Sequence, residues 1–277
     1  MMEEFFIITN TNKDPELWYQ RRIADFLEAR GKRCRFACET PDGAKKSPGD
    51  HTDCILVLGG DGTMLQAARE NVDRGVPLLG INLGTLGYLA EIEKNGWEQA
   101  LRQLLSGDYL IEERMMLEGV VNGESRADHA LNDVAITRFG SLQMVSYAIY
   151  VNGQYLNTFQ ADGVIVSTPT GSTGYNMSAG GPIVEPSARA LLLTPICPHT
   201  LNARSIVLSA EDVISIVIGQ SREGENAQVE VDFDGSGSRR IVHPGDEIRV
   251  CRDRRTVRIV KLSQRSFLET LHRKMTG

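Results

Sequence analysis

Positive charge and long apolar runs are both scarce in this 277-residue sequence. Lysine and arginine number 30 against 36 aspartates and glutamates, so the formal net charge is -6 at pH 7. A general nucleic-acid binder needs a basic face, and this composition argues against one. The stretch "MMEEFFIITN" has acids where a secretory signal has lysine or arginine, and its apolar run is too short to span a membrane. We therefore expect a cytoplasmic protein without nucleic-acid or membrane partners, which holds anionic ligands by backbone groups and metal.

Cysteine and histidine are also few, and their spacing excludes familiar metal and catalytic sites. The five histidines show no metal-ligand spacing, and no G-x-S-x-G motif accompanies them. Only Cys34 and Cys38 lie close in the sequence, without a second pair to complete a zinc site. We interpret all five cysteines as reduced, mostly structural thiols: Cys34, Cys38, Cys54, Cys197 and Cys251.

The first third of the chain alternates strand-like and helix-like patterns. Buried strands are predicted for "EFFIIT" (4–9), "CILVL" (54–58) and "VPLLGIN" (76–82). Helices are predicted from Asp14-Pro15 to Gly31, and over 64–71 and 97–105. Because strands and helices that alternate form a parallel sheet covered by helices, we predict an α/β N-terminal domain over residues 1–112.

Beyond about residue 110 the pattern becomes rich in strands. The segments "EGVVNGESR" and "AIYVNGQYL" each place Asn-Gly between strand-like runs, which is a strong hairpin signal. Further strand-like runs follow at 163–167, 205–208, 213–218, 228–233 and 256–262. We predict an antiparallel, sandwich-like domain over residues 113–255. The final segment, 256–277, contains the helical pattern "RSFLETLHRKM" and is expected to pack back on the first domain.

The stretch "LVLGGDGTMLQAAR" places three glycines and an aspartate between a predicted strand and a predicted helix. It is neither a P-loop, because G-x-x-x-x-G-K-[ST] is absent, nor the G-x-G-x-x-G of a dinucleotide fold. Backbone N–H groups near a helix N-terminus favour an anion, which predicts a phosphate loop of Gly59, Gly60 and Thr63. The alternative is a tight turn in which Asp61 caps the helix.

A second stretch, "QADGVIVSTPTGSTGYNMSAGGPIVEP" (160–186), is rich in glycine and hydroxyl side chains. Small residues let a base or sugar approach the backbone, and polar side chains can bond a nucleoside. The candidate donors and acceptors are Thr173, Tyr175, Asn176 and Ser178. The alternative is a long solvated loop.

Two polar neighbours, Asn132 and Asp133, lie inside the apolar run "ALNDVAI". Buried polar groups are costly without a partner, and hydrogen bonds to a ribose would supply one. A strand end with an Asx turn is the alternative interpretation.

Taken together, "GGDGT", "LNDVAI" and "DGVIVSTPTGSTGYNMSAGGPIVEP" resemble the ATP-dependent NAD kinases in order and separation, and the resemblance covers most of the chain. It implies an α/β domain, a β-rich domain, a nucleotide site in the crevice between them, and assembly as a homodimer or homotetramer. The implied reaction transfers the γ-phosphoryl group of ATP to the 2′-hydroxyl of the adenosine ribose of NAD. Whether inorganic polyphosphate replaces ATP, or NADH replaces NAD, stays open.

The resemblance also assigns residue roles. Asp61 would accept the proton of the 2′-hydroxyl, and its charge would favour Mg²⁺ beside the phosphates. Gly62 would lie close to the substrate, and Asp162 would reach the nicotinamide end from a neighbouring subunit. The remaining contacts to ribose and adenine would come from Asn132, Asp133, Thr173, Gly174, Tyr175 and Ser178. Two positions depart from the family: Gly174 stands where alanine is common, and Ser236 where glutamine is.

Two other functions fit parts of the pattern. A diacylglycerol- or sphingosine-type lipid kinase shares the GGDGT loop, but "GGDGTMLQAAR" lacks the Asn-Glu that often follows it and no membrane-binding segment stands out. A non-catalytic NAD-sensing module would keep the hydroxyl-rich loop and could lose the carboxylate, yet Asp61 is present.

Overall fold

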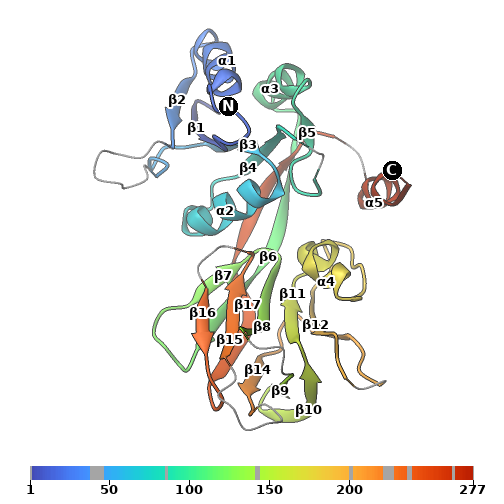
Figure 1. Cartoon of the computed structure of the whole chain (residues 1–277). Coiled ribbons are helices and arrows are strands. Elements are labelled where there is room, and N and C mark those ends of the chain that lie inside the picture. The colour runs from blue at the N-terminus through green and yellow to red at the C-terminus, as the bar shows by residue number, and fades with distance from the viewer. Residues whose placement is uncertain are drawn as a thin grey trace. The chain divides into compact units, whose positions relative to one another are not determined.

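The computed structural model describes residues 2–37, 47–84, 87–140, 144–199, 202–220, 228–235, 239–263 and 266–276. Cys38 and Ser236, named above, lie outside these ranges. The chain forms two compact units, the first made of Met1–Glu113 with Val257–Gly277 and the second of Arg114–Thr256. Figure 1 shows the elements of both units, and each unit is described by itself below.

The first unit is built on a parallel sheet, as the sequence predicts. Its strands, in spatial order, are the end of β17 (Glu247–Lys261), β4 (Leu78–Asn82), β3 (Cys54–Gly59), β1 (Glu4–Thr9) and β2 (Arg33–Phe36). A short strand, β5 (Ile92–Glu93), also pairs with β4. All of these pairs are parallel, so their carboxyl ends lie along one edge of the sheet.

Helices cover both faces of this sheet. The unit contains the helices α1 (Trp18–Glu28), α2 (Asp61–Asn71), α3 (Trp97–Ser106) and α5 (Phe267–Thr276) and a short 3-10 turn η1 (Val72–Arg74), and the first three of these helices cover the sheet. Side chains of α1 and α3 share one core cluster with Phe5, Ile7 and Leu79. Gly80 follows Leu79 in β4, so a side chain at Gly80 would point to the opposite face of the sheet. A Cβ added at Gly80 would lie 2.9 Å from Met64 Sδ of α2. Helix α2 therefore packs on the opposite face.

Two helices begin at different residues than the sequence predicts. Helix α1 begins at Trp18 rather than near Pro15, because the buried Asp14 carboxylate accepts the N–H groups of Trp18, Tyr19 and Gln20 at 2.8, 3.0 and 3.2 Å. Helix α2 begins at Asp61, three residues before the predicted start. No helix in the described ranges is both long and apolar enough to cross a membrane.

The second unit consists of two sheets, and the strand pairs described in them are antiparallel. One sheet has the order β10 (Gln154–Ala161), β9 (Val145–Val151), β14 (Ile214–Ile218), β17, β6 (Leu110–Val121) and β7 (Asp128–Ala130). The other has the order β13 (Ile206–Ser209), β12 (Ala190–Ile196), β11 (Gly163–Ser167), β8 (Asp133–Phe139), β15 (Gln228–Phe233) and β16 (Arg240–Val242). Two short helical turns, η2 (Thr170–Thr173) and α4 (Tyr175–Ser178), follow β11.

Both predicted Asn-Gly hairpins are confirmed. The central residues have positive φ angles, 50° and 66° at Asn122 and Gly123 and 51° and 78° at Asn152 and Gly153. Asn152-Gly153 joins β9 directly to β10, whereas Asn122-Gly123 begins the longer connection of residues 122–127 between β6 and β7. Positive φ at both residues of such a turn matches the right-handed twist of the flanking strands.

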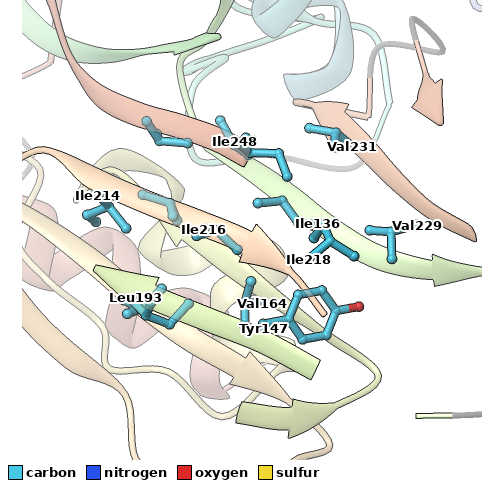
Figure 2. Close-up of a cluster of buried hydrophobic side chains, with 14 of the residues drawn as sticks. Ile136, Tyr147, Val164, Leu193, Ile214, Ile216, Ile218, Val229, Val231 and Ile248 are labelled. Carbon is cyan, nitrogen blue, oxygen red and sulfur yellow. The ribbon is translucent and has the colours of Figure 1, made fainter. Parts of the chain in front are cut away.

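The core of the second unit lies between its two sheets. Ile214, Ile216 and Ile218 alternate with half-buried residues along β14, and Val229 and Val231 do the same in the other sheet. Figure 2 shows these side chains together with Ile136, Val164 and other aliphatic residues of the cluster. Alternating inward residues from two antiparallel sheets form a sandwich, which confirms the predicted fold class.

Candidate functional site

In the first unit, the glycine-rich stretch is the sharp turn from β3 into α2. Gly60 is the N-cap, with extended backbone angles of φ -140° and ψ -168°. A Cβ added at Gly59 would lie 2.2 Å from Thr63 Oγ1, so the turn itself requires this glycine. A Cβ added at Gly62 would meet nothing within 4 Å. The chain therefore leaves open space beside Gly62, where the sequence predicts a substrate.

Thr63 ties this turn together. Its Oγ1 accepts the N–H of Gly60 at 3.4 Å and the side-chain amide N–H of Asn10 at 3.2 Å. Asn10 follows β1, and its own backbone N–H donates to the Leu58 carbonyl at 2.8 Å. The ends of two parallel strands and the start of α2 are thus joined through one hydroxyl group.

The Asp61 carboxylate does not cap its own helix. Oδ2 accepts the N–H of Tyr88 at 2.7 Å, and Oδ1 accepts the N–H groups of Leu89 and Ala90 at 3.1 and 3.2 Å. A carboxylate has about four lone-pair sites, so about one acceptor site on Oδ2 stays available. Burial and the nearby Asp61 charge raise the pKa of Tyr88. Asp61 is therefore a fixed, half-buried carboxylate with limited remaining acceptor capacity.

A lysine lies beside the turn although the sequence carries no P-loop. A Cβ added at Gly60 would lie 2.7 Å from Lys13 Nζ, and one added at Gly84 would lie 3.0 Å from the same atom. Lys13 follows β1, so sequence reasoning confined to the glycine-rich stretch missed it. Within the described ranges, no residue forms a hydrogen bond or ion pair with this ammonium group. The ammonium group therefore places a positive charge beside the turn.

In the second unit, Asn132 and Asp133 are held by a carboxylate from another strand. Asp234, just after β15, accepts the backbone N–H groups of Leu131, Asn132 and Asp133 at 2.7, 2.7 and 3.1 Å. Asp234 itself has a φ of 58°, and its N–H donates to the Asp133 carbonyl at 3.0 Å. This arrangement fixes the backbone at the start of β8. The sequence signal for this arrangement is the Asp-Gly pair that follows β15.

The hydroxyl-rich turn after β11 packs closely against the same pair. A Cβ at Gly171 would lie 2.1 Å from the Asn132 carbonyl oxygen, so only glycine fits there. A Cβ at Gly174 would lie 3.4 Å from Asn132 Nδ2 and 3.7 Å from Asp133 Oδ2. The structure therefore brings Asn132, Asp133 and Gly174 together. Thr173, next to Gly174, is half-buried and its Oγ1 donates to the Thr170 carbonyl at 3.4 Å.

The Asp133 carboxyl group has an unusual protonation equilibrium. Burial raises its pKa to about 7, and the negative charges of Asp234 and Asp232 add to the effect. Burial also raises the pKa of Tyr175, with further contributions from Cys197, Asp133 and Asp162. One polar region of this unit therefore contains the Tyr175 phenol, the half-buried Gly174 and the Asp133 carboxyl group.

The remaining predicted residues of this turn differ in exposure. Tyr175 and Ser178 are exposed, whereas Asn176 is fully buried. The Asn176 amide donates to the carbonyls of Ser172 and Pro182 at 3.2 and 3.0 Å and accepts the Thr194 hydroxyl at 2.7 Å. All of these partners belong to the protein, so the Asn176 side chain stabilises the turn.

Asp162 lies between β10 and β11, and its carboxylate forms an ion pair. Arg138 Nε donates to Asp162 Oδ1 at 2.8 Å, and both side chains are partly exposed. The Asp162 carbonyl accepts the Arg138 N–H at 2.9 Å and the hydroxyl of the buried Tyr147 at 3.4 Å. The position of this carboxylate is therefore well determined within its unit.

One group of side chains in the described ranges has ligand atoms close enough for a metal ion. Glu118, His129 and Asp253 place theirs within 4.8 Å of one another. Arg255 already donates to both Asp253 oxygens, at 3.0 and 2.7 Å. Burial opposes ionisation of Asp253, but hydrogen bonds from His129 and Arg255 outweigh it and hold its pKa well below the usual range. The guanidinium supplies the positive charge here, so we assign no metal to this group.

Comparisons with known proteins identify the family. A model of the ATP-NAD kinase N-terminal domain matches residues 39–109, and one of the ATP-NAD kinase C-terminal domain matches residues 131–262. The NAD kinase of Lachnospira eligens is 44% identical over 295 residues, covering 99% of this chain and 100% of that protein. The chain belongs to the ATP-NAD kinase family. The family member of Lachnoclostridium phytofermentans is 42% identical over 99% of both chains.

Solved structures of this kinase family have the same fold. The structure of yeast NADH kinase in complex with NADH has a TM-score of 0.85 at 25% identity, covering 99% of this chain and 88% of that chain. An NAD kinase from Archaeoglobus fulgidus in complex with ATP has a TM-score of 0.78 at 24% identity, covering 99% of both chains. The resemblance inferred from three sequence blocks is therefore confirmed.

Proposed function

We propose that this protein is an NAD kinase that makes NADP from NAD and ATP. The 2′-hydroxyl oxygen of the adenosine ribose bonds to the γ-phosphorus while the bond to the β,γ-bridging oxygen breaks, releasing ADP. The hydroxyl proton passes to the Asp61 carboxylate. The full-length match to NAD kinases carries this proposal. The fixed Asp61 carboxylate and the clustering of Asn132 with Asp133 support it.

Asp61 can act as a weak general base. Phosphoryl transfer passes through a loose transition state, so catalysis depends mainly on positioning and charge stabilisation. Three backbone N–H groups fix the carboxylate, and one of its oxygens keeps a site for the proton. Gly59, Gly60 and Thr63 shape the turn that presents backbone N–H groups to phosphate, and Gly62 leaves room for the substrate.

The second unit supplies the residues proposed to bind NAD. Asn132 and Asp133 hold the ribose whose hydroxyl reacts, because an amide and a carboxylate can bond two neighbouring hydroxyls. Thr173, Gly174, Tyr175 and Ser178 contact adenine and sugar, and Asn176 holds the turn that carries them. Asp162 contacts the nicotinamide end.

Mg²⁺ fits this site as a companion of ATP. Mg²⁺ is usually bound through substrate phosphates, waters and one or two carboxylates rather than a protein cage. Asp61 has about one acceptor site left, and no three-residue ligand cluster in the described part of the chain includes it. When bound, the ion neutralises charge on the transferred phosphoryl group.

The direct test is an assay with purified protein, ATP, Mg²⁺ and NAD. A dehydrogenase that uses only NADP reports product formation. Parallel reactions contain NADH, diacylglycerol or inorganic polyphosphate, and a metal chelator tests the need for Mg²⁺. We expect phosphorylation of NAD by ATP. Phosphorylation of diacylglycerol alone would favour a lipid kinase, and binding of NAD without product would favour a sensor.

Gly62→Ala tests whether the substrate approaches the helix start. The added methyl group meets nothing in the protein, and alanine favours a helix by up to about 1 kcal/mol over glycine. We expect an unchanged or higher unfolding midpoint with kcat/KM lowered by about tenfold or more, because a methyl group displaces the reacting hydroxyl. Gly96→Ala, at the start of α3, is the matched control. Equal activity of both variants and the parent would contradict the assignment of Gly62.

The raised pKa of Asp133 predicts that NAD binding depends on pH. This pKa is raised to about 7, and the ionised carboxylate accepts hydrogen bonds from the ribose hydroxyls more strongly than the protonated carboxyl group does. The KM for NAD should therefore fall as pH rises from about 6 to 8 and level off above that range, since each pH unit changes the ratio of ionised to protonated carboxyl by about tenfold. Asp133→Asn should remove the inflection. An inflection that persists in the variant belongs to another group.

The raised pKa of Asp133 also makes stability depend on pH, but stability falls as pH rises whereas NAD binding strengthens. The folded state binds the Asp133 proton more tightly than the unfolded state, whose carboxyl pKa is about 3.9. This contribution to the free energy of unfolding is present at low pH and is lost as pH rises from about 4 to 7. Urea unfolding across this window separates the stability effect from the effect on NAD binding.

Assembly and location are proposed from the family resemblance and the composition. We propose a homodimer or homotetramer in which Asp162 contacts NAD bound to a neighbouring subunit, and a cytoplasmic location. Light scattering on the active enzyme measures assembly, and full activity in a monomer would contradict the shared site.

A further inference from the structure

The segment that holds the Asp61 carboxylate is itself held by the C-terminal part of the chain. Three consecutive residues, Tyr88, Leu89 and Ala90, donate their backbone N–H groups to this carboxylate at 2.7, 3.1 and 3.2 Å. Figure 1 shows β5, which begins two residues after Ala90, together with the end of β17 and with α5. Glu91 follows Ala90 directly, so a displacement of Glu91 moves the donors of these bonds.

Both oxygens of the Glu91 carboxylate contact residues at or just after the end of β17. Oε2 lies 2.9 Å from Lys261 Nζ, and Oε1 accepts the N–H of Ser263 at 3.1 Å. The side chains of Glu91 and Lys261 are only 14% and 25% exposed, so water screens this pair less than it screens a surface pair. Leu262, between the two partners, is buried in the core, and its carbonyl accepts the Gln103 side-chain amide at 2.7 Å. Glu91 is therefore tied to a part of the sheet that is itself fixed.

Helix α5 makes two further contacts with the same segment, and both are weaker. Arg273 Nη2 lies 3.1 Å from Glu93 Oε1, but both of these side chains are more than half exposed. Lys274 Nζ lies 5.1 Å from the centroid of the Tyr88 ring. Exposed ion pairs and exposed cation–π contacts contribute little on their own. The ion pair of Glu91 is therefore the main connection between this segment and the end of the chain.

We propose that Glu91 and Lys261 are positioning residues for the phosphoryl transfer. Neither is assigned a contact with substrate, and both act through the backbone N–H groups that orient the Asp61 carboxylate. The end of β17 thereby sets the position of the base. The proposal rests on the proposed function, because it takes Asp61 as the base. A misplacement of about 1 Å in an active site can lower the rate by about 100-fold, so a small shift of the segment is enough.

Substitutions of two lysines test this role. Lys261→Met keeps a side chain of similar length but removes the charge opposite Glu91, and we expect kcat to fall by about tenfold or more. The KM values for NAD and ATP should stay within about threefold of the parent, and Lys261→Arg, which keeps a positive charge, should recover kcat to within about threefold. Lys32→Met is the matched control, because Lys32 pairs with Glu3 at 2.7 Å in the same unit, and kcat should not change.

The same substitution in an Asp61→Asn background separates positioning from a general loss of structure. Asparagine removes the base, so a residue that acts by placing the carboxylate has little left to affect. Lys261→Met should then lower the remaining kcat by less than about twofold, which is a coupling of about fivefold or more between the two sites. An equal loss in both backgrounds would overturn the proposal, and so would a parental kcat in Lys261→Met.

Hydrogen exchange gives a readout that does not depend on activity. In Lys261→Met, the amides of residues 87–93 should exchange faster than in the parent, whereas in Lys32→Met they should exchange at the parental rate. If Lys261→Met does not fold, Glu91→Gln replaces it, because glutamine removes the ion pair but keeps an acceptor for the Ser263 N–H. Parental exchange in the variant that folds would overturn the proposal. If the parent does not phosphorylate NAD, the proposed function fails, and the exchange rates alone decide whether Lys261 holds the segment.

Discussion

Replacing Asp61 by asparagine is expected to lower kcat by about 10²- to 10⁴-fold, the usual contribution of a general base. The amide keeps the shape of the side chain but cannot take the proton of the ribose hydroxyl. NAD affinity should change by less than about threefold, because the proposed ribose contacts come from Asn132 and Asp133. Initial rates at saturating ATP and NAD, together with NAD binding by calorimetry, measure the two effects separately.

Asparagine at position 61 also disturbs the hydrogen bonds that the carboxylate accepts from the backbone. A control variant must therefore disturb similar hydrogen bonds elsewhere. The Asp61 carboxylate accepts three backbone N–H groups, and the NH₂ of an amide would face one of those donors. Asp14 likewise accepts three backbone N–H groups in the same unit, so Asp14→Asn makes the same chemical change away from the proposed base. Equal losses of kcat in the two variants would show that Asp61 acts only through local structure.

A companion variant moves the Asp61 carboxylate without removing it. A Cβ at Gly87 would lie 1.8 Å from Asp61 Oδ1, and three backbone hydrogen bonds, two of them to Oδ1, resist displacement of the carboxylate. Gly87→Ala should therefore also lower kcat while the carboxylate is still present. Together the variants distinguish the chemistry of Asp61 from its position.

Asp234→Ala is expected to lower the free energy of unfolding by about 2 to 4 kcal/mol, because three backbone hydrogen bonds lose their acceptor. NAD binding should weaken as well, since the freed segment carries Asn132 and Asp133. Urea unfolding and NAD titration measure the two effects.

Three further variants separate the causes of this loss. Asp234 has a φ of 58°, so Asp234→Gly removes the carboxylate without strain. Asp234→Asn keeps one oxygen acceptor and removes a negative charge, which should lower the pKa of Asp133. Asp212 accepts the Ser209 N–H at 2.9 Å and the Asn152 side-chain amide at 2.7 Å, both in exposed positions, so Asp212→Ala should cost only about 1 kcal/mol. A similar loss in Asp212→Ala and Asp234→Ala would contradict the special importance of Asp234.

Local sequence patterns predict much of this fold because their signals lie within a few residues. The Asn-Gly turns and the strand-helix alternation are examples, and both are confirmed. Two buried strands, β8 and β12, were not predicted as separate elements. Continuous apolar runs such as Ala190–Ile196 give no alternation that distinguishes a strand from a buried helix.

The candidate site was less predictable where its contacts join distant segments. The partners of Asp61 lie 27 to 29 residues downstream, and Asp234 is 101 residues or more from the groups it bonds. Lys13 reaches the glycine-rich turn only because β1 and β3 are adjacent in the sheet. Such contacts depend on strand order, which the sequence pattern does not specify.

The discontinuity of the first unit has a consequence for synthesis on the ribosome. Residues Val257–Gly277 belong to that unit but follow the whole second unit in the chain. Strand β4 therefore has no β17 beside it while residues 114–256 are being made, and a buried apolar strand then has an unpaired edge. Domains usually fold in the order in which they emerge, but here the second unit can complete its sheets first. The unit that carries Asp61 is finished only when the end of β17 and helix α5 are released.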